Sequence, residues 1–382
     1  MSIIDRVETF LVPPRWLFVR LETSDGLIGW GEASLEGSAE IVRQTVSQFS
    51  EVLIGADPSR IVDLHQILSR GNFYRGGPIF SSAIAGIDQA LWDLAGRRHG
   101  VPVYQLLGGP VRDRIRVYGW IGGDDPSEIG QQIEGRVEAG FSAIKMNASG
   151  RLGPLATAAE LDEIVSRAQA ARQALGPERD FAIDFHGRLT LANARRLAPL
   201  LEPLRPMFIE EPVAPEKTAL LRQITSSTTI PIATGERLYH RTEFRPALEA
   251  GVAVIQPDLS HAGGITEVRQ IASLAEIFDA QLAPHCPLGP IALAACLQVG
   301  FATPNYLIQE QSIGIHYNQG AEVLDYVLDS QPLGFVDGYA ALLSGPGLGV
   351  EIDEAAVRAA GQVGHSWRTP VWRTADGAFA EW

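Results

Sequence analysis

FAID (181–184), MFIE (207–210), PIATGE (231–236), AVIQPD (253–258), QLAPH (281–285) and YLIQE (306–310) are short apolar runs that each end in an acidic or imidazole side chain. The closing residues follow one another at intervals of 26, 26, 22, 27 and 25 residues and are Asp184, Glu210, Glu236, Asp258, His285 and Glu310. A strand, a helix and their loops take about this length in a (β/α)8 barrel of roughly 250 residues, where catalytic groups lie at the C-terminal strand ends. The sequence therefore predicts six strands that present polar groups to one pocket, which is typical of an enzyme.

Two further apolar runs precede these six, IRVYGWIG (115–122) and SAIKMN (142–147), and bring the candidate strands to eight. Helical patterns lie between the strands, for example LDEIVSRAQAARQALG (161–176) and TEVRQIASLAEIFDA (266–280). Parallel strands need crossovers of this kind. The predicted fold class is therefore α/β, with a TIM-like barrel.

The N-terminal section has a different pattern. IDRVETFLV (4–12) and LFVRLETSDGLIGWGEA (17–33) predict antiparallel strands, with a turn at 24–26. Helical spacing follows in residues 38–55 and 81–100. We predict an α+β domain at 1–112, a barrel at 113–325 and a C-terminal segment at 326–382 that packs back on the first domain.

Composition excludes several classes of protein. The chain has 382 residues, a net charge of −14 and no basic patch with interleaved aromatic residues, which argues against a nucleic-acid partner. No apolar run is long enough to span a membrane, and the first residues do not resemble a signal peptide. Cys286 and Cys296 have neither metal-site nor redox spacing, so we expect two buried thiols in a cytoplasmic protein.

Three carboxylates on adjacent strand ends, Asp184, Glu210 and Glu236, predict a divalent metal site. Mg²⁺ prefers oxygen ligands and keeps positions for water or substrate. A lone carboxylate at a strand end is more often a helix cap or an ion-pair partner. Three in register make the metal site the better interpretation. Glu211 should point away from the ion, because successive strand residues face opposite sides.

Two histidines are candidates for acid–base chemistry. His285 and Asp258 close neighbouring strands, and a carboxylate beside an imidazole fixes its tautomer and makes it a better base. His186 stands two residues after Asp184, on the same strand face, and suits a general acid. The alternative for either histidine is a satisfied position in the core.

Other positions carry weaker signals. Lys145 and Asn147 share one strand face, and a lysine at a barrel mouth could neutralise a substrate carboxylate, act as a base or lie on the surface. Glu310 could hydrogen-bond opposite the metal. Loops at 13–19 and 72–78, with Arg15, Trp16 and Tyr74, either close over the pocket or line the domain contact. The Gly263–Gly264 pair is interpreted as a βα turn.

At these residues the chain resembles the enolase superfamily, and the Asp258–His285 pair resembles its mandelate racemase subgroup. Within that subgroup it is similar to the galactonate dehydratases, through segments along nearly the whole chain. They include PPRW (13–16), FYRGGPI (73–79), DFHGR (184–188), IEEPV (209–213), QPDLSHAGGITE (256–267), QEQSIGIHYN (309–318) and AEW (380–382). The resemblance implies a modified TIM barrel of (β/α)7β type with an N-terminal α+β capping domain completed by the C-terminal tail. It also implies a homo-oligomer.

The resemblance implies roles as well. Asp184, Glu210 and Glu236 would hold one Mg²⁺ per subunit, and His285, polarised by Asp258, would take the C2 proton of an acid sugar. His186 would protonate the departing 3-hydroxyl, while Lys145 and Glu310 would brace the substrate carboxylate. The implied reaction is dehydration of D-galactonate. Asn147, Arg15, Trp16, Tyr74 and His316 are the implied substrate contacts.

Two departures from the racemases of this subgroup bear on the reaction. Racemases carry Lys-x-Lys on the second barrel strand and Asp-x-Asn on the third, where this chain has Lys145-x-Asn147 and Asp184-x-His186. Loss of one base and gain of an acid favours elimination over racemisation or epimerisation. Dehydration of another aldonate or aldarate, such as gluconate, is the alternative within the enzymes. A catalytically inactive binding protein is the alternative outside them.

Overall fold

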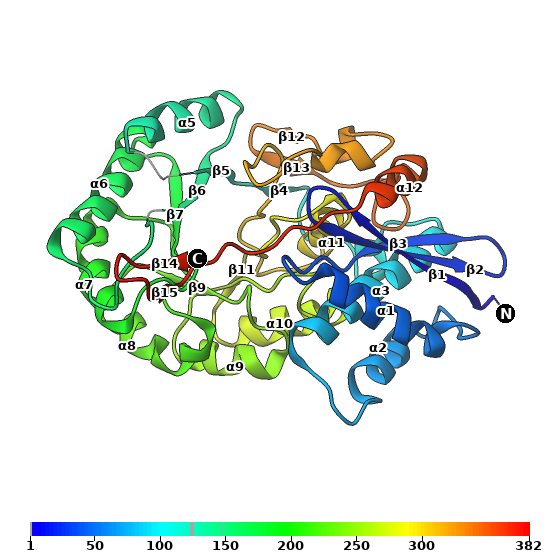
Figure 1. Ribbon diagram of the computed structural model, residues 1–382. Helices are drawn as coiled ribbons and strands as arrows, with labels where there is room; N and C mark the ends of the chain where they lie inside the picture. The colour runs from blue at the N-terminus through cyan, green and yellow to red at the C-terminus, as the bar shows by residue number, and fades with distance from the viewer. Residues whose placement is uncertain (1, 123–125, 148) are drawn as a thin grey trace.

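The computed structural model describes residues 2–122, 126–147 and 149–382 and contains an antiparallel sheet domain beside a parallel barrel (Figure 1). The first domain has the antiparallel sheet β1 (Ile4–Val12), β2 (Trp16–Thr23) and β3 (Ile28–Glu32). Its helices are α1 (Ala39–Leu53), α2 (Ile61–Arg70), α3 (Gly77–His99) and α4 (Val103–Leu106). The predicted strands, their turn and both predicted helices are confirmed, while α2 and α4 were not predicted.

The barrel has seven parallel strands that pair in chain order. They are β5 (Gly119–Ile121), β6 (Ala143–Asn147), β7 (Asp180–Asp184), β8 (Ile209–Glu210), β9 (Ile232–Thr234), β10 (Val254–Ile255) and β11 (Gln281–Leu282). Seven helices are described around it: α5 (Pro126–Glu138), α6 (Ala158–Leu175), α7 (Leu191–Leu201), α8 (Leu221–Thr225), α9 (Arg241–Glu249), α10 (Gly264–Ile277) and α11 (Pro290–Phe301).

The eighth predicted strand, residues 306–310, closes the barrel through isolated bridges. Tyr306 bridges Leu282 at one side, and Gln309 bridges Val117 at the other. These eight segments surround the barrel interior, and each contributes one residue to a buried apolar cluster there. Its members are Tyr118, Ala143, Ala182, Phe208, Ala233, Val254, Ala283 and Ile308. The predicted fold class, an α/β barrel with a separate N-terminal domain, is confirmed.

The first predicted barrel strand is divided between two sheets. β4 (Arg114–Arg116) pairs with β13 (Tyr339–Ala341), which pairs in turn with β12 (Phe335–Val336). Only β5 joins the barrel. The apolar run 115–122 is continuous in sequence, but its two halves pair with different segments. The backbone N–H of Val117 donates to the carbonyl of Gly338, whereas that of Tyr118 donates to the carbonyl of Gln309.

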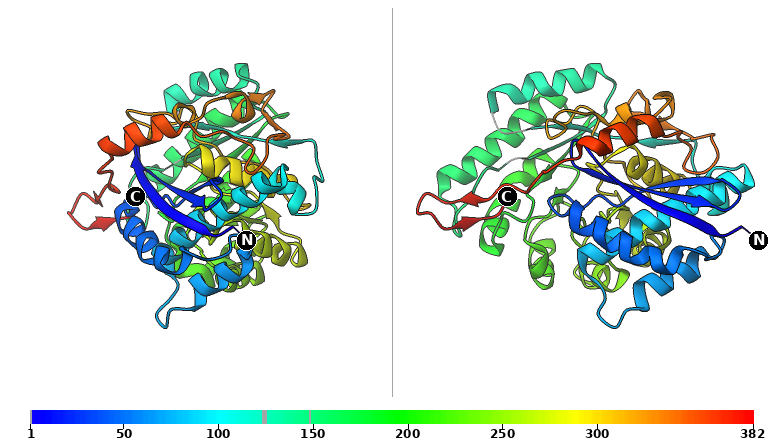
Figure 2. Two further views of the ribbon diagram at one scale, coloured as in Figure 1. Left: turned by 90° about the vertical axis from the view of Figure 1, so that its right-hand side faces the viewer. Right: turned by 45° about the vertical axis from the view of Figure 1, so that its right-hand side comes forward.

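The C-terminal segment divides in a similar way. Helix α12 (Glu354–Val363) packs against β1, with Arg358 Nη2 3.0 Å from Glu8 Oε2. After α12 the chain leaves the first domain and crosses to the barrel, where β14 (Trp372–Arg373) and β15 (Phe379–Ala380) form a hairpin (Figures 1 and 2). We call residues 365–382 the crossing segment. Its hairpin lies at the barrel, whereas we expected all of 326–382 to lie on the first domain.

Buried polar contacts fix the first domain against the barrel. Asp88 on α3 accepts hydrogen bonds from the backbone N–H and the hydroxyl of Thr266, in the first turn of α10. Gly264 has φ +81°, and a Cβ there would lie 2.5 Å from Asp88 Oδ2, so close approach of the two helices requires glycine.

No described helix is both long and apolar enough to pass through a bilayer.

Glu32, at the end of β3, makes a second such contact. Its carboxylate accepts hydrogen bonds from the backbone N–H groups of Gly289 and Ala292, at the N-terminus of α11. Burial raises the pKa of Glu32 to about 7, although these N–H groups oppose the shift. The domain contact therefore contains a carboxyl that titrates near neutral pH.

We expect this carboxyl to make stability fall as pH rises from about 5 to 7. Its folded pKa is raised, so in that range the folded state retains a proton that the unfolded state has lost. Below this range both states hold the proton, and above it neither does. Urea unfolding at pH 5, 6, 7 and 8 should show a larger loss for the wild type than for Glu32→Gln. Parallel profiles for the two proteins would contradict this assignment.

Candidate active site

The polar residues predicted from the strand ends meet at one end of the barrel. Asp184 and Glu210 close β7 and β8, and Glu236 follows β9 by two residues. A cavity of about 500 Å³ opens there, a volume typical of small-molecule sites. Its lining includes Lys145, Asp184, His186, Glu236, His285 and Glu310.

Lys145 is a buried cation of this site. Its Nζ lies 3.0 Å from Glu310 Oε1 and 3.8 Å from Asp184 Oδ2, and it also pairs with Glu210 Oε1. Burial opposes its charge, but the carboxylates of Glu210 and Glu310 outweigh burial and raise its pKa well above the usual value. Lys145 is therefore neither on the surface nor neutral, and its place is that of a counter-ion.

Asp184, Glu210 and Glu236 form a cluster in which one oxygen from each lies within 4.8 Å of the others. Among the described residues, Glu210 Oε2 and Glu236 Oε2 are buried oxygens without a hydrogen-bond partner. Burial raises the pKa of both glutamates. Burial opposes ionisation of Asp184 too, but the charges of His186 and Lys145 outweigh it and lower its pKa. Buried carboxyl oxygens left unpaired fit the donor set of a hard divalent cation, whose charge would favour their ionised form.

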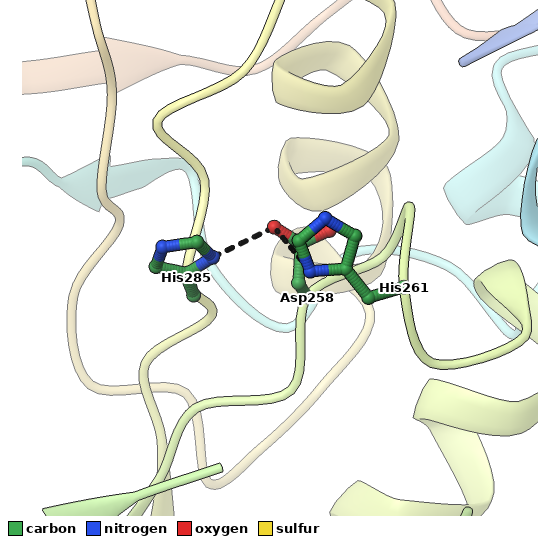
Figure 3. A group of neighbouring side chains, drawn as sticks. All are labelled: Asp258, His261 and His285. Atoms are coloured by element: carbon green, nitrogen blue, oxygen red, sulfur yellow. Dashed lines mark hydrogen bonds and ion pairs between the residues drawn. The ribbon is translucent and has the colours of Figure 1, made fainter. Parts of the chain in front are cut away.

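Asp258 and His285 form the pair that the sequence predicts. The Nδ1–H of His285 donates to Asp258 Oδ2 at 2.8 Å, so the tautomer leaves Nε2 toward the cavity, 3.5 Å from Glu236 Oε2 (Figure 3). Burial opposes protonation, but the Glu236 charge and the Asp258 hydrogen bond outweigh it and raise the pKa of His285 well above the usual value.

His261, which sequence reasoning missed, lies on the other side of Asp258 (Figure 3). Its Nδ1 is 3.7 Å from Asp258 Oδ2, and its Nε2 is 3.3 Å from Glu36 Oε2. Burial opposes ionisation of Glu36, but the hydrogen bond and charge of His261 lower its pKa to about 2. Glu36 and His261 both line the cavity. His261 follows Asp258 by three residues, and this spacing could have indicated that the two side chains lie together.

His186 reaches the cavity by a different route from the one predicted. β7 ends at Asp184, and His186 has φ +49°, so it lies in a turn and strand alternation does not aim its ring. Its Nε2 is 2.8 Å from Asp184 Oδ2, and its Nδ1 is 3.1 Å from Arg188 Nη2. When the ring is neutral, Nδ1 accepts from this guanidinium, which only donates, and Nε2 carries the proton.

Glu211 faces away from the three carboxylates, as predicted. It also has a positive φ, +42°. Its Oε1 accepts from the backbone N–H of Gly235 at 3.0 Å, and its Oε2 accepts from Arg237 Nη2 at 2.6 Å. Arg237 Nε in turn lies 3.6 Å from Glu236 Oε1. Glu211 thus supports the loop that carries Glu236.

The five predicted substrate contacts lie in different places. Arg15, in the turn before β2, lines the cavity, but Trp16, the first residue of β2, is fully buried in the core against Phe18 and Tyr326. Tyr74 is 83% exposed and outside the cavity lining.

Asn147 and His316 also stay outside the lining of that cavity. Asn147 is buried opposite Asp184 in the β6–β7 register. His316 contacts Tyr317, with ring centroids 3.9 Å apart and planes tilted by 42°, and lines a neighbouring hollow next to α5. Tyr317 is the member of this pair that faces the cavity.

Both cysteines are buried free thiols, as predicted.

The crossing segment supplies cavity residues that the sequence did not predict. Trp367, Phe379, Glu381 and Trp382 all line it.

Comparisons with known proteins agree along the whole chain. Residues 11–108 match the N-terminal domain of the mandelate racemase and muconate lactonizing enzymes, and residues 128–356 match the enolase C-terminal domain-like family. A D-galactonate dehydratase of Variovorax paradoxus is 52% identical over 99% of this chain and 100% of its own length. One from Pectobacterium atrosepticum is 50% identical with the same coverage.

Solved structures of the same fold also match. An enolase from Agrobacterium radiobacter, provisionally assigned as a galactarate dehydratase and holding Na and L-malate, superposes with a TM-score of 0.89 at 32% identity over 100% of both chains. A provisionally assigned dehydratase from Mesorhizobium loti gives 0.88 at 31% identity, covering 94% of this chain and 98% of its own.

The carboxylate cluster makes a prediction about metal binding. We expect titration calorimetry to show one Mg²⁺ per chain, and Asp184→Asn or Glu236→Gln to weaken binding by about tenfold or more, since each removes an anionic ligand. Asp162→Asn, an exposed carboxylate on α6, is the matched control. Unchanged affinity in both cluster variants would place the ion elsewhere.

Proposed function

The chain belongs to the enolase superfamily, in its mandelate racemase subgroup, and is a hydro-lyase; we propose that it converts D-galactonate to 2-dehydro-3-deoxy-D-galactonate and water. The substrate is supported by the curated relatives of that activity, which match over their full length. One observation carries the chemistry. Two imidazoles, His285 and His186, each lie against a different member of one carboxylate cluster.

Dehydration of an acid sugar needs one group that removes the C2 proton and a second that protonates the leaving 3-hydroxyl. His285 suits the first task, because Asp258 fixes its tautomer and leaves Nε2 at the cavity. His186 suits the second in its imidazolium form, because it lines the same cavity and can release the Nε2 proton that it shares with Asp184 Oδ2. Loss of water leaves a C2–C3 enol, which tautomerises to the 2-keto acid as C3 gains a proton and the C2 oxygen loses one.

Asp184, Glu210 and Glu236 would hold Mg²⁺. When bound, the ion supplies positive charge for the negative charge that develops on the substrate carboxylate once C2 is deprotonated. Lys145 holds Glu210 and Glu310 in place by ion pairs. Arg15, also in the cavity lining, offers a second positive charge for an anionic substrate.

The alternatives differ from this proposal in residues that can be named. A racemase needs a second base on β6, where this chain has Asn147 outside the cavity lining. Another aldonate or an aldarate would use the same acid and base. The provisional galactarate assignment of one structural relative places aldarates among the substrates to be tested.

We expect 2-keto acid to form from D-galactonate in a panel of aldonates and aldarates, with Mg²⁺ present and not with chelator. Turnover of a different acid would support the proposed mechanism and replace D-galactonate as the proposed substrate. Absence of turnover with every acid in the panel would contradict a dehydratase of this class.

His186→Asn should separate the two steps. We expect dehydration to fall by about 100-fold or more, since general acid–base groups typically contribute 10²–10⁴-fold. Exchange of the C2 proton with solvent deuterium, followed by NMR, should persist, because His285 and Asp258 are intact. Mg²⁺ content must equal that of the wild type. Loss of exchange with the metal retained would show that His186 is not a separate acid.

A further inference from the structure

The crossing segment brings Trp382 from the far end of the sequence to the proposed acid. Trp382 and His186 have ring centroids 6.0 Å apart, with planes tilted by 34°. Trp382 also contacts Tyr317 and Trp367, each at 6.1 Å between centroids. These separations are within the range of favourable aromatic contacts. All four rings line the cavity.

The segment is attached at the barrel mouth by cation–π contacts. Arg188 lies 4.7 Å and Arg151 5.9 Å from the ring of Trp372 on β14. Arg151 also donates a hydrogen bond to the carbonyl of Arg373 at 3.0 Å. Arg188 is the residue that contacts His186 Nδ1, so the hairpin and the histidine turn share one side chain.

The ring of His186 needs support of this kind. Its backbone lies beyond the end of β7, and its polar contacts run to Arg188 and to Asp184 Oδ2. Asp184 is also a proposed metal ligand. An oxygen that binds a cation is less able to anchor the imidazole, whereas contact with Trp382 does not compete with a cation.

We propose that Trp382 is a positioning residue for His186, which holds the imidazole at the cavity so that the proton reaches the leaving hydroxyl. This inference rests on the proposed role of His186 as the acid. Trp382 itself needs no contact with the reacting atoms. Its loss should therefore impair the elimination step and spare proton removal by His285, whose anchor is Asp258.

Trp382→Ala, Trp382→Phe and Ile277→Ala test this in the full-length chain with Mg²⁺. Ile277 is an exposed aliphatic residue on α10, outside the cavity lining, and is the control for loss of a large apolar side chain. We expect Trp382→Ala to lower kcat for dehydration of D-galactonate by about 10- to 100-fold, the scale of small misplacements of catalytic groups. Deuterium exchange at C2 should stay within about twofold, and Trp382→Phe should recover most of the loss.

A second readout needs neither turnover nor metal. In protein with ¹³C-labelled histidine rings, the signal that disappears in His186→Asn should be the one that moves most in Trp382→Ala, because it loses the ring current of the indole. This separates failure of the inference from failure of the proposed function. An unmoved His186 signal, equal losses of exchange and dehydration, or an unchanged kcat would each overturn the inference.

Discussion

The ammonium group of Lys145 is the interaction on which the barrel mouth depends. A buried charge is costly unless it is paired, and Lys145 is paired with carboxylates from β8, from β7 and from the segment that closes the barrel. It therefore holds the ends of several strands at one point. It is also outnumbered, because Asp184, Glu210 and Glu310 surround a single lysine. That surplus of negative charge is the physical reason to propose a cation at this place.

A second constraint is that the pocket is not a property of the barrel alone. Arg15 and Glu36 come from the first domain, and contacts such as those of Glu32 and Asp88 hold that domain against the N-terminal turns of α11 and α10. Helix N-termini attract carboxylates, since their N–H groups lack partners within the helix. The same chemistry thus joins the two domains at two helices.

Much of this arrangement could be predicted from sequence, because strand length and crossover length are local properties. The spacing predicted the order of the strands and the residues that meet at their ends. Trp16 shows a limit, since Arg15 and Trp16 are adjacent in PPRW and only the fold decides which one faces the cavity. The division of 115–122 between two sheets is another limit, because the partners Gly338 and Gln309 are about 200 residues away. Trp382 belongs to the AEW segment that carries the resemblance, but no spacing in the sequence placed it at the cavity.

The two histidines differ most in how they are held. His285 is fixed by a direct hydrogen bond to Asp258. The two residues follow neighbouring strands, which the barrel itself brings together. His186 lies in a turn with a positive φ, and its environment includes a segment from the other end of the sequence. The proposed base is therefore held by the barrel, a fold that many reactions can share, whereas the proposed acid depends on segments added to the barrel. Within one fold, elimination could thus be gained or lost by changes around His186 while proton removal at C2 is preserved.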